Sequence, residues 1–448
     1  MRARNRELLA LVPVALLVTA GFTAVFITKS EQIGDLSLTY GGYFLAACLV
    51  CHLFLRFRLP YADPYLFPLC ALLAAIGLVV IYRIKEDLAF DQASVFVLGL
   101  ALFCVTIVVL RDYHVLERYR YLIATAGILL LLAPRLPGIG AQVNEAYLGI
   151  KLGPVNFQPS ELAKICIVIF LASYLAENRE LLSVAARRFL GLTIPPLKHF
   201  GPLLVVWGAA MLMLVATRDL GSSLMFFGAF LALLYVATAR FSYVLVGLLM
   251  FGAGAYLLGS GISHVSDRVE IWLDPFGSTA TGAGQVQQSL FAQADGGLFG
   301  RGLGESLLRL PGPFAPDCQQ PFPECGSILP APHTDFIYAV ITMELGLFGA
   351  CGVILIYALI AARGFKTAVM APDGFSKLLA AGLTAIFALQ AFVIIGGVTK
   401  VIPLTGVTLP FVSFGGSSIV ANMILLALLL VVSDAARRPR AEAGGVVS

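Results

Sequence analysis

The chain of 448 residues is 59% hydrophobic and only 12% charged. Soluble domains carry about 25% charged residues, so this composition excludes a soluble enzyme, a disordered chain and a DNA-binding protein. The net charge of +4 is too small to indicate a polyanionic partner. The composition therefore predicts a polytopic membrane protein.

Long apolar runs recur along the whole chain. A bilayer core needs about 20 apolar residues per helix, and twelve runs approach or exceed this length, the fifth being the shortest. The predicted spans are 8–28, 38–55, 64–82, 93–110, 119–134, 160–176, 200–216, 222–239, 241–260, 336–362, 378–398 and 416–433. No clear internal repeat is present, so residues 1–448 are predicted to form a single all-α membrane domain.

Two connections are long, one near residues 135–159 and one over residues 261–335, between the ninth and tenth spans. Lys and Arg residues in short loops accumulate on the cytoplasmic side of membrane proteins. With the N-terminus inside, 19 of these residues fall on that side, whereas the short outward loops carry 7. We therefore expect both termini, including the tail 435–448, in the cytoplasm and both long connections outside.

Six of the eight cysteines lie in apolar runs, where cysteine commonly acts as a small hydrophobic residue. Cys318 and Cys325 differ because they lie in a proline-rich stretch of the long outward connection. An oxidising exterior favours pairing, so we predict a disulfide between them. A metal site is a poorer interpretation, because two sulfurs without a nearby histidine are too few ligands.

Ionisable side chains inside membrane segments are costly, so each one is a candidate functional residue. Seven lie within or at the ends of the predicted spans: Glu161, Lys164, Arg218, Asp219, Asp335, Glu344 and Lys400. All except Glu344 lie near the outward ends of their spans. This clustering predicts a polar site at the outer face of the membrane rather than a channel through its middle.

Glu161 and Lys164 are three residues apart, so they share one face of a helix and can form an ion pair. A buried structural pair and a contact to substrate are equally consistent with this spacing. Arg218 and Asp219 precede Gly221 at a tight turn between two apolar runs. A local charge pair in this turn is the simpler interpretation, and a role in the outer-face site is the alternative.

Asp335 follows His333 and Thr334 and precedes a predicted span. Thr and Asp at a helix start commonly cap backbone N–H groups, which lowers the basicity of the carboxylate, whereas burial raises it. A carboxylate at the membrane surface, beside a histidine and facing a loop, is also a candidate for catalysis. Glu344 points from the opposite face of that helix, about 13 Å deeper, so we predict that it hydrogen-bonds to a neighbouring helix.

Residues 295–304 are glycine-rich but lack the Lys-Ser/Thr of a phosphate-binding loop, and no predicted strand precedes them. A turn close to the membrane is therefore the favoured interpretation. The preceding segment 285–298 places Val286, Leu290 and Phe291 on one side, which predicts an interfacial helix.

Four blocks of this sequence resemble the SEDS family (shape, elongation, division and sporulation), which contains the RodA and FtsW peptidoglycan glycosyltransferases. The first is FQPSELAK at residues 157–164, and the second is DLGSS at residues 219–223. The third extends from Trp272 to Gly346 and includes the His-Thr-Asp triplet that ends at Asp335. The fourth is PLTGVTLPFVSFGGSS at residues 403–418. The four blocks occur in the family's order.

The resemblance implies that lipid II is polymerised into glycan strands at the outer face of the bacterial cytoplasmic membrane, for elongation or division. The growing strand on its polyprenyl diphosphate is the donor, and a sugar hydroxyl of another lipid II is the acceptor. The α-linked donor and β-linked product make the reaction inverting, which requires one general base. The essential acid of the family corresponds to Asp335, which we predict to be this base.

Stabilisation of the leaving diphosphate requires cations. The candidates on the outer face are Lys400, Arg218, Lys164 and Arg301. The other candidate substrate-binding residues are His333, Thr334, Glu161, Asp219, Gln288 and Ser413. No metal site or cofactor is firmly implied, and a divalent cation is left open. The implied partners are the lipid-linked substrates, membrane lipid and a class B penicillin-binding protein, with no nucleic acid.

The sequence departs from the family pattern in several places. Tyr147 and its two predecessors stand where the family usually has Arg-Trp, and Arg218 replaces a common proline. Residues 311–330 contain an insertion, and residues 1–60 add about two helices to the family's usual ten. These features resemble an actinobacterial RodA-type branch.

Two other functions are compatible with this pattern. A lipid II flippase or exporter would carry ionisable groups through the membrane, often at broken helices, so clustering at one face favours the enzyme. A scaffold that recruits a transpeptidase without chemistry of its own is the second alternative, because the sequence departs from the family pattern near Tyr147.

Overall fold

The computed structural model describes residues 2–30, 35–136, 140–143, 146–152, 155–178, 187–189, 192–194, 220–259, 263–280, 282–306, 329 and 331–439. Helices dominate this part of the chain: α1 (Arg2–Ala10), α2 (Val12–Ser30), α3 (Asp35–Arg58), α4 (Leu66–Ile84), α5 (Glu86–Val109), α6 (Val115–Arg118), α7 (Arg120–Leu132), α8 (Pro159–Glu177), α11 (Leu220–Thr238), α12 (Phe241–Gly259), α13 (Ser263–Leu273), α14 (Ala283–Gly296), α15 (Ile337–Met370), α16 (Gly374–Val398) and α17 (Gly416–Arg437). The connections contain a 3-10 turn, η1 (Ala133–Arg135), and the strands β1 (Gly140–Val143), β2 (Ala146–Leu152), β3 (Val155–Phe157), β4 (Arg187–Phe189) and β5 (Leu192–Ile194).

The predicted all-α membrane fold is confirmed. In the described part of the chain, nine helices are long and apolar enough to cross a membrane. Two further predicted spans correspond to shorter apolar helices, namely α7, with 13 residues, and the stretch Phe241–Gly254 of α12. The predicted span at 200–216 lies outside the described residues.

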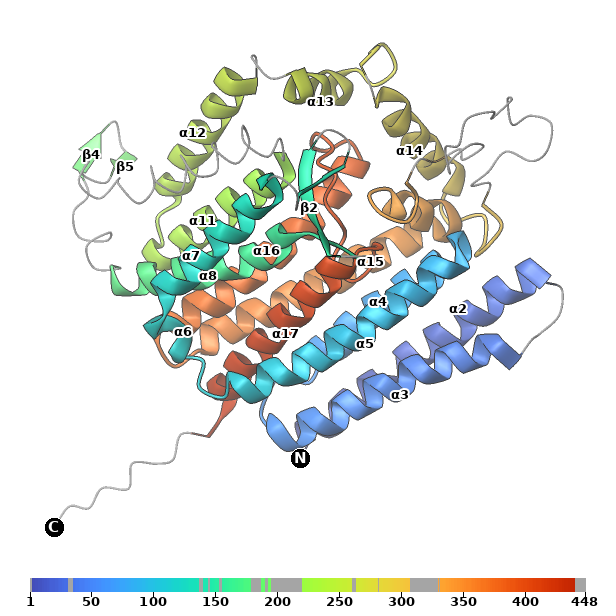
Figure 1. Ribbon diagram of the computed structural model, residues 1–448, viewed down its shortest axis with the longest axis horizontal. Helices are drawn as coiled ribbons and strands as arrows, with labels where there is room; N and C mark the ends of the chain where they lie inside the picture. Colours follow the sequence, from blue (N-terminus) through green and yellow to red (C-terminus); the bar gives the residue numbers. More distant parts are fainter. Residues whose placement is uncertain are drawn as a thin grey trace.

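The helices form a bundle in which α16 packs against α8, α11, α15 and α17 (Figure 1). Small residues allow close approach at these crossings, as is common in membrane proteins. A Cβ at Gly364 of α15 would lie 2.2 Å from Thr384 Oγ1 of α16. A Cβ at Gly382 of α16 would lie 2.8 Å from Val168 Cγ1 of α8. These glycines therefore set how closely the central helices pack.

The helices α2 and α3 lie along one side of the bundle, against α4 and α5 (Figure 1). They correspond to the additional N-terminal helices predicted within residues 1–60. Two aromatic contacts join them to the core. The rings of Phe22 and Tyr82 meet edge to face at 5.3 Å, and those of Phe44 and Phe96 stack at 5.0 Å.

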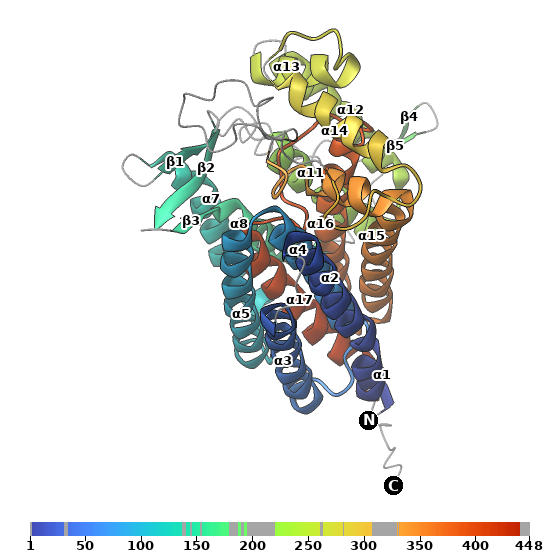
Figure 2. The ribbon, with the colours of Figure 1, turned by 90° about the vertical axis from the view of Figure 1, so that its right-hand side faces the viewer.

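An ionic cluster joins distant parts of the chain at one end of the bundle. Asp63 is fully buried and accepts hydrogen bonds from Arg363 at 2.8 Å and from Arg437 at 2.7 Å. Arg4 donates to the carbonyl oxygen of Ala62. Figure 2 shows the start of α1 and the end of α17 at this end, opposite α13 and α14. The cluster therefore fastens α1, α15 and α17 together.

The connection at 135–159 differs from the predicted loop, because it contains a small antiparallel sheet in the order β1-β2-β3. Its register pairs Gly140 with Ile150 and Lys151 with Asn156. This segment is short and contains glycine, so its apolar and polar residues do not alternate over enough positions to predict strands. A helix forms in the predicted segment 285–298, as α14.

The helix α15 is kinked rather than continuous, because Gly346 has φ 67° and ψ −168°. The glycine-rich segment that follows α14 packs against the kink. Arg301 N donates to Met343 O at 3.0 Å, and Leu347 N donates to Gly297 O at 2.9 Å. A side chain at Gly346 would be strained, since L residues rarely adopt this backbone conformation. The predicted span at 336–362 is therefore interrupted by a kink at Gly346.

Candidate active site

Asp335 lies in the turn that immediately precedes α15, where it is partly buried. It faces Arg268 of α13 across the backbone of Gly406, in the connection between α16 and α17. A Cβ at position 406 would lie 3.6 Å from Oδ2 of Asp335 and 3.7 Å from Nη2 of Arg268. Gly406 has φ 70°, a conformation that favours glycine. Its missing side chain leaves space between the carboxylate and the guanidinium group.

The segment before Asp335 is held by the connection between α16 and α17. The hydroxyl of Ser413 donates to the carbonyl oxygen of Thr334 at 2.7 Å and accepts from the N–H of Leu409 at 2.9 Å. Phe414 N donates to His333 O at 2.8 Å. Ser413 is buried, so its hydroxyl positions the backbone beside Asp335.

The helix α5 supports this arrangement from the other side. The amide of Gln92 donates to Ser413 O at 3.0 Å and accepts from Gly415 N at 3.3 Å. Gln92 is buried, so these bonds are protected from water. The turn that carries Asp335 is therefore connected through one loop to the membrane helices.

Arg268 and Lys400 belong to the contact between α13 and the end of α16. Arg268 donates to the carbonyl oxygen of Leu404. Trp272 Nε1 donates to Lys400 O at 3.1 Å, and Lys400 Nζ lies 3.5 Å from Leu273 O. These bonds place two cationic side chains of distant segments at the same side of the site.

Burial raises the pKa of Asp335 to about 6, and the positive charge of Arg268 opposes this rise. A carboxylate with this pKa is ionised at neutral pH and is a better proton acceptor than an ordinary aspartate. The N-cap residue of α15 is Phe336, which makes no side-chain cap bond. The geometry therefore favours an acid–base role over a capping role.

Glu161 and Lys164 form the predicted ion pair, with Lys164 Nζ 2.6 Å from Glu161 Oε2. The same ammonium group donates to Gln390 Oε1 at 2.6 Å and lies 3.4 Å from Asn422 Oδ1. Gln390 in turn donates to the carbonyl oxygen of Thr408 at 2.9 Å. All of these charged and amide side chains are buried. The network therefore connects α8, α16 and α17 beneath the loop that carries Gly406.

Glu344 contacts the neighbouring helix α4, as predicted, but through an ion pair rather than a hydrogen bond. Its carboxylate accepts a hydrogen bond from Ser306 and lies 3.3 Å from Nε of Arg83 on α4. Arg301 is exposed and paired with Asp295, with Nε 3.1 Å from Oδ2. The charge of Arg301 is therefore largely balanced locally, which weakens its candidacy as a diphosphate contact.

Other predicted residues are placed less fully. Gln288 is half-buried on α14. Arg218, Asp219, Cys318, Cys325 and, apart from Leu329, the insertion 311–330 lie outside the described residues. Gly221, next to the second block, lies where a Cβ would be 3.2 Å from Thr405 O. The start of α11 is thus next to the Gly406 loop. Within the described residues, no three His, Cys, Asp or Glu side chains form a group that could hold a metal ion.

Arg268 and Thr405 are site residues that sequence reasoning did not single out. Thr405 is buried, and in the described part of the chain its hydroxyl has no hydrogen-bond partner. Neither residue stands out by spacing, because Arg268 reaches Asp335 only through folding and Thr405 is near the site only as the neighbour of Gly406. The position of Thr405 directly before Gly406, within the fourth block, was the available signal.

The fold and site define a helical membrane protein in which a carboxylate and a guanidinium group face each other at one end of the bundle. The family described as cell cycle protein, which includes FtsW, RodA and SpoVE, matches residues 64–438. The chain belongs to this family and is a multi-pass membrane protein.

Curated relatives match most of the chain. The peptidoglycan glycosyltransferase RodA of Mycobacterium tuberculosis is 38% identical over 447 residues, which cover 97% of this chain and 92% of the relative. Stage V sporulation protein E of Bacillus subtilis is 31% identical over 379 residues, covering 82% of this chain and 95% of the relative.

Two solved structures share the fold. A chain of a peptidoglycan synthase complex that coordinates polymerization and crosslinking has a TM-score of 0.64 at 24% identity, covering 84% of this chain and 99% of that chain. The rod shape determining protein RodA of Thermus thermophilus has a TM-score of 0.57 at 24% identity, covering 84% of this chain and 98% of that chain.

Proposed function

We propose that this protein is a peptidoglycan glycosyltransferase that polymerises lipid II at the outer face of the bacterial cytoplasmic membrane. The observation that carries the mechanism is the partly buried carboxylate of Asp335, which faces Arg268 across the open space at Gly406. Relatives with 38% identity over nearly the whole chain carry this activity in their names.

In the proposed reaction, Asp335 accepts the proton of the acceptor sugar hydroxyl. The hydroxyl oxygen attacks the anomeric carbon of the donor sugar and forms the new glycosidic bond. The bond from this carbon to the polyprenyl diphosphate breaks on the opposite face, which inverts its configuration. The diphosphate leaves with the bonding electron pair. With a pKa of about 6, Asp335 is roughly 90% ionised at pH 7 and is ready to accept the proton.

Cations beside the site stabilise the leaving diphosphate in this proposal. Lys400 is partly exposed beside α13, and its ammonium group contacts a carbonyl oxygen at 3.5 Å. It is the candidate with the best access to a ligand among Lys400, Lys164 and Arg301. Lys164 is enclosed by its buried network, and Arg301 is paired with Asp295. His333 and Thr334 act through the backbone segment that they share with Asp335.

We also propose that both termini are cytoplasmic. The end of the bundle that carries the start of α1 and the end of α17 contains Arg4, Arg363, Arg437 and Arg438. Such a concentration of arginine is typical of the cytoplasmic side. Asp335 then lies at the outer face, where a class B penicillin-binding protein is the proposed partner. Copurification of the two proteins from detergent-solubilised membranes tests the partner.

The deciding experiment uses purified protein and lipid II, with Asp335→Asn as the test variant. Asn has nearly the same shape but cannot accept the proton, so glycan strand formation should fall at least a hundredfold. Equal strand formation by both proteins would show that Asp335 is not the base. A folded wild type that makes no strands, alone or with its partner, would contradict the enzymatic function.

A flippase or exporter is separated from the enzyme in the same preparation. Reconstituted vesicles that move labelled lipid II across the bilayer without forming strands would favour transport. Strand formation without partner protein would exclude a purely scaffolding role. The clustering of the described charged candidates around one end of the bundle favours the enzyme over the flippase or exporter.

A further inference from the structure

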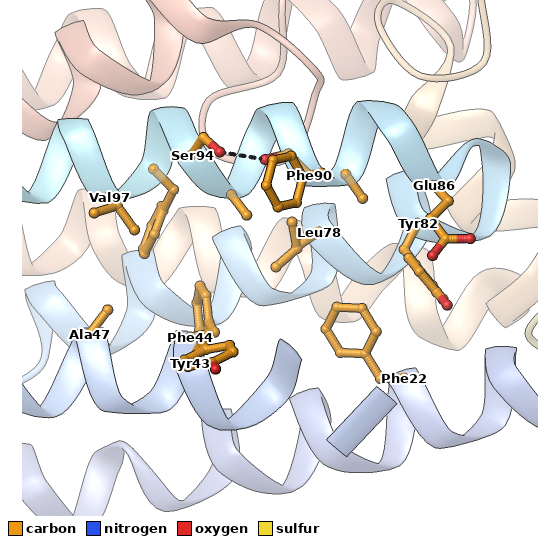
Figure 3. Close-up of a pocket in the computed structure, with 13 residues that line it drawn as sticks. Phe22, Tyr43, Phe44, Ala47, Leu78, Tyr82, Glu86, Phe90, Ser94 and Val97 are labelled. Atoms are coloured by element: carbon orange, nitrogen blue, oxygen red, sulfur yellow. Dashed lines mark hydrogen bonds between the residues drawn. The ribbon is translucent and has the colours of Figure 1, made fainter. Parts of the chain in front are cut away.

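A pocket of about 260 Å³ lies between the N-terminal helices and the core (Figure 3). Phe22 of α2 and Phe44 of α3 line one side, whereas Leu78 of α4 and Phe90 of α5 line the other. The family match begins at residue 64, so four of the lining residues, Phe22, Tyr43, Phe44 and Ala47, precede it. The pocket is separate from the proposed active site and plays no part in the reaction described above.

The aromatic contacts explain why a space remains between these helices. The Phe22–Tyr82 and Phe44–Phe96 pairs hold the two helix pairs together at separate points along their length. The lining also includes Ala47 and Ala93, whose side chains are single methyl groups. Large rings at the contacts and small side chains elsewhere in the lining therefore leave room for the pocket.

The pocket opens toward the surrounding membrane. Tyr43, Phe90 and Val97 line it, yet their exposed fractions are 71%, 65% and 57%. An apolar cavity of this kind does not hold water well, because water finds too few polar partners there. An engineered cavity of about 150 Å³ holds benzene, so this volume accommodates an apolar chain of roughly ten carbon atoms. The alkyl chain of a membrane lipid fits this description.

One end of the pocket is polar and acidic. Figure 3 shows Glu86 and Tyr82 at this end and Ala47 and Val97 at the other. Glu86 is exposed, and its segment also carries exposed Asp87 and Asp91. The cations of this segment are Lys85, which is exposed, and Arg83, which is paired with Glu344. This charge disfavours a phosphate or diphosphate close to Glu86 and favours an ammonium group. The lipid-linked diphosphate of the proposed reaction is therefore a poor ligand for this pocket.

The pocket lies at the same level of the bundle as the turn that carries Asp335. Gln92 projects from α5, between the pocket residues Phe90 and Ser94, and bonds the Ser413 loop. Arg83, next to the pocket residue Tyr82, pairs with Glu344. A chain in the pocket would thus pack against the helix that supports the active-site loop.

We propose that this pocket binds the alkyl chain of a membrane lipid whose head group carries an ammonium group. Glu86 contacts that head group, and the aromatic lining holds the chain. The two N-terminal helices complete the site.

The test uses the full-length protein in lipid nanodiscs that contain a trace of photoreactive lipid. Phosphatidylethanolamine and phosphatidylglycerol with the same diazirine-bearing acyl chain are compared. Irradiation and peptide mass spectrometry measure labelling of residues 43–47 and 89–97. Wild type should label at these segments, with the ethanolamine lipid favoured at least threefold over the glycerol lipid.

Ala47→Phe and Ala93→Phe fill the pocket and should each reduce this labelling at least fivefold. Ala101→Phe, on the exposed face of α5 beyond the pocket, is the matched control and should label like wild type. Glu86→Gln should remove the preference between the two lipids while retaining labelling. Glu86→Gln still tests the proposal if the Ala47→Phe and Ala93→Phe variants do not fold.

Unchanged labelling in folded Ala47→Phe and Ala93→Phe would overturn the pocket as the binding site. Equal or stronger labelling of wild type by the anionic lipid would overturn the head-group assignment. Both readouts are independent of strand formation, so a failure of the proposed transferase activity leaves them interpretable.

Discussion

Replacing Lys164 with methionine would leave the carboxylate of Glu161 without its cation inside the bundle. The side chains of Lys164 and Glu161 are 1% and 2% exposed, and their charged atoms lie 2.6 Å apart. Methionine nearly matches the volume of the lysine stem but has neither charge nor donor, so the perturbation is mainly electrostatic. Gln390 loses the same donor, which lies 2.6 Å from its amide oxygen.

Removing one partner of a buried ion pair destabilises a protein by about 3–5 kcal/mol, because the other charge stays buried. We expect a loss of this size for Lys164→Met. Combining it with Glu161→Gln removes both charges and retains hydrogen-bonding atoms near Gln390. The double variant should therefore recover more than half of the lost stability.

Unfolding of the purified protein in detergent, followed by thermal scanning fluorescence, measures both variants. Lys366→Met, at an exposed position of α15, is the control and should unfold like wild type. An unchanged unfolding temperature for Lys164→Met would refute the structural role of the pair. If the folded double variant polymerises lipid II at the wild-type rate, the pair does not bind substrate; a stable but inactive double variant would support the substrate contact.

The pKa of Asp335, about 6, predicts that kcat/KM for polymerisation falls about tenfold per pH unit below pH 6, since the base is then protonated. Arg268→Gln should move this limb to higher pH, because Arg268 lowers the pKa; a rate independent of pH between 5 and 7 would contradict the assignment. Gly406→Ala should lower stability by about 1–2 kcal/mol, because alanine is strained at a φ of 70°. It should also reduce strand formation more than tenfold. Wild-type activity would argue against the space at Gly406 as the reaction site. Asp63→Ala should lower stability by about 3–5 kcal/mol, because Arg363 and Arg437 lose their buried acceptor; thermal unfolding measures this loss, and an unchanged midpoint would contradict it.

Much of the helical fold could be predicted, because apolar runs of about 20 residues have few alternatives in a bilayer. The predicted spans at 64–82, 378–398 and 416–433 correspond to α4, α16 and α17. The sheet at 140–157 and the kink at Gly346 could not be predicted in the same way. Both depend on contacts with other segments, such as the bonds from Arg301 and Leu347 across the kink.

The candidate site was predictable only in part. Glu161 and Lys164 form their ion pair because helical spacing alone places them on one face. Asp335 was identified by its motif, but its facing partner Arg268 lies 67 residues earlier in the sequence, and no periodicity relates the two. Ser413 was a candidate by its motif, but no periodicity relates it to Thr334, whose backbone carbonyl accepts a hydrogen bond from the Ser413 hydroxyl.

The sequence by itself determined that the chain is a multi-pass helical protein. It also determined which segments carry few charges and which carboxylate is a candidate base. These properties follow from local composition, because each span must satisfy its own backbone hydrogen bonds within the membrane. Only the tertiary structure decided that Lys164 is enclosed by amides and that Asp335 faces Arg268 across Gly406. Burial and the distance between charges set the basicity of a carboxylate, and both are properties of segments brought together by folding.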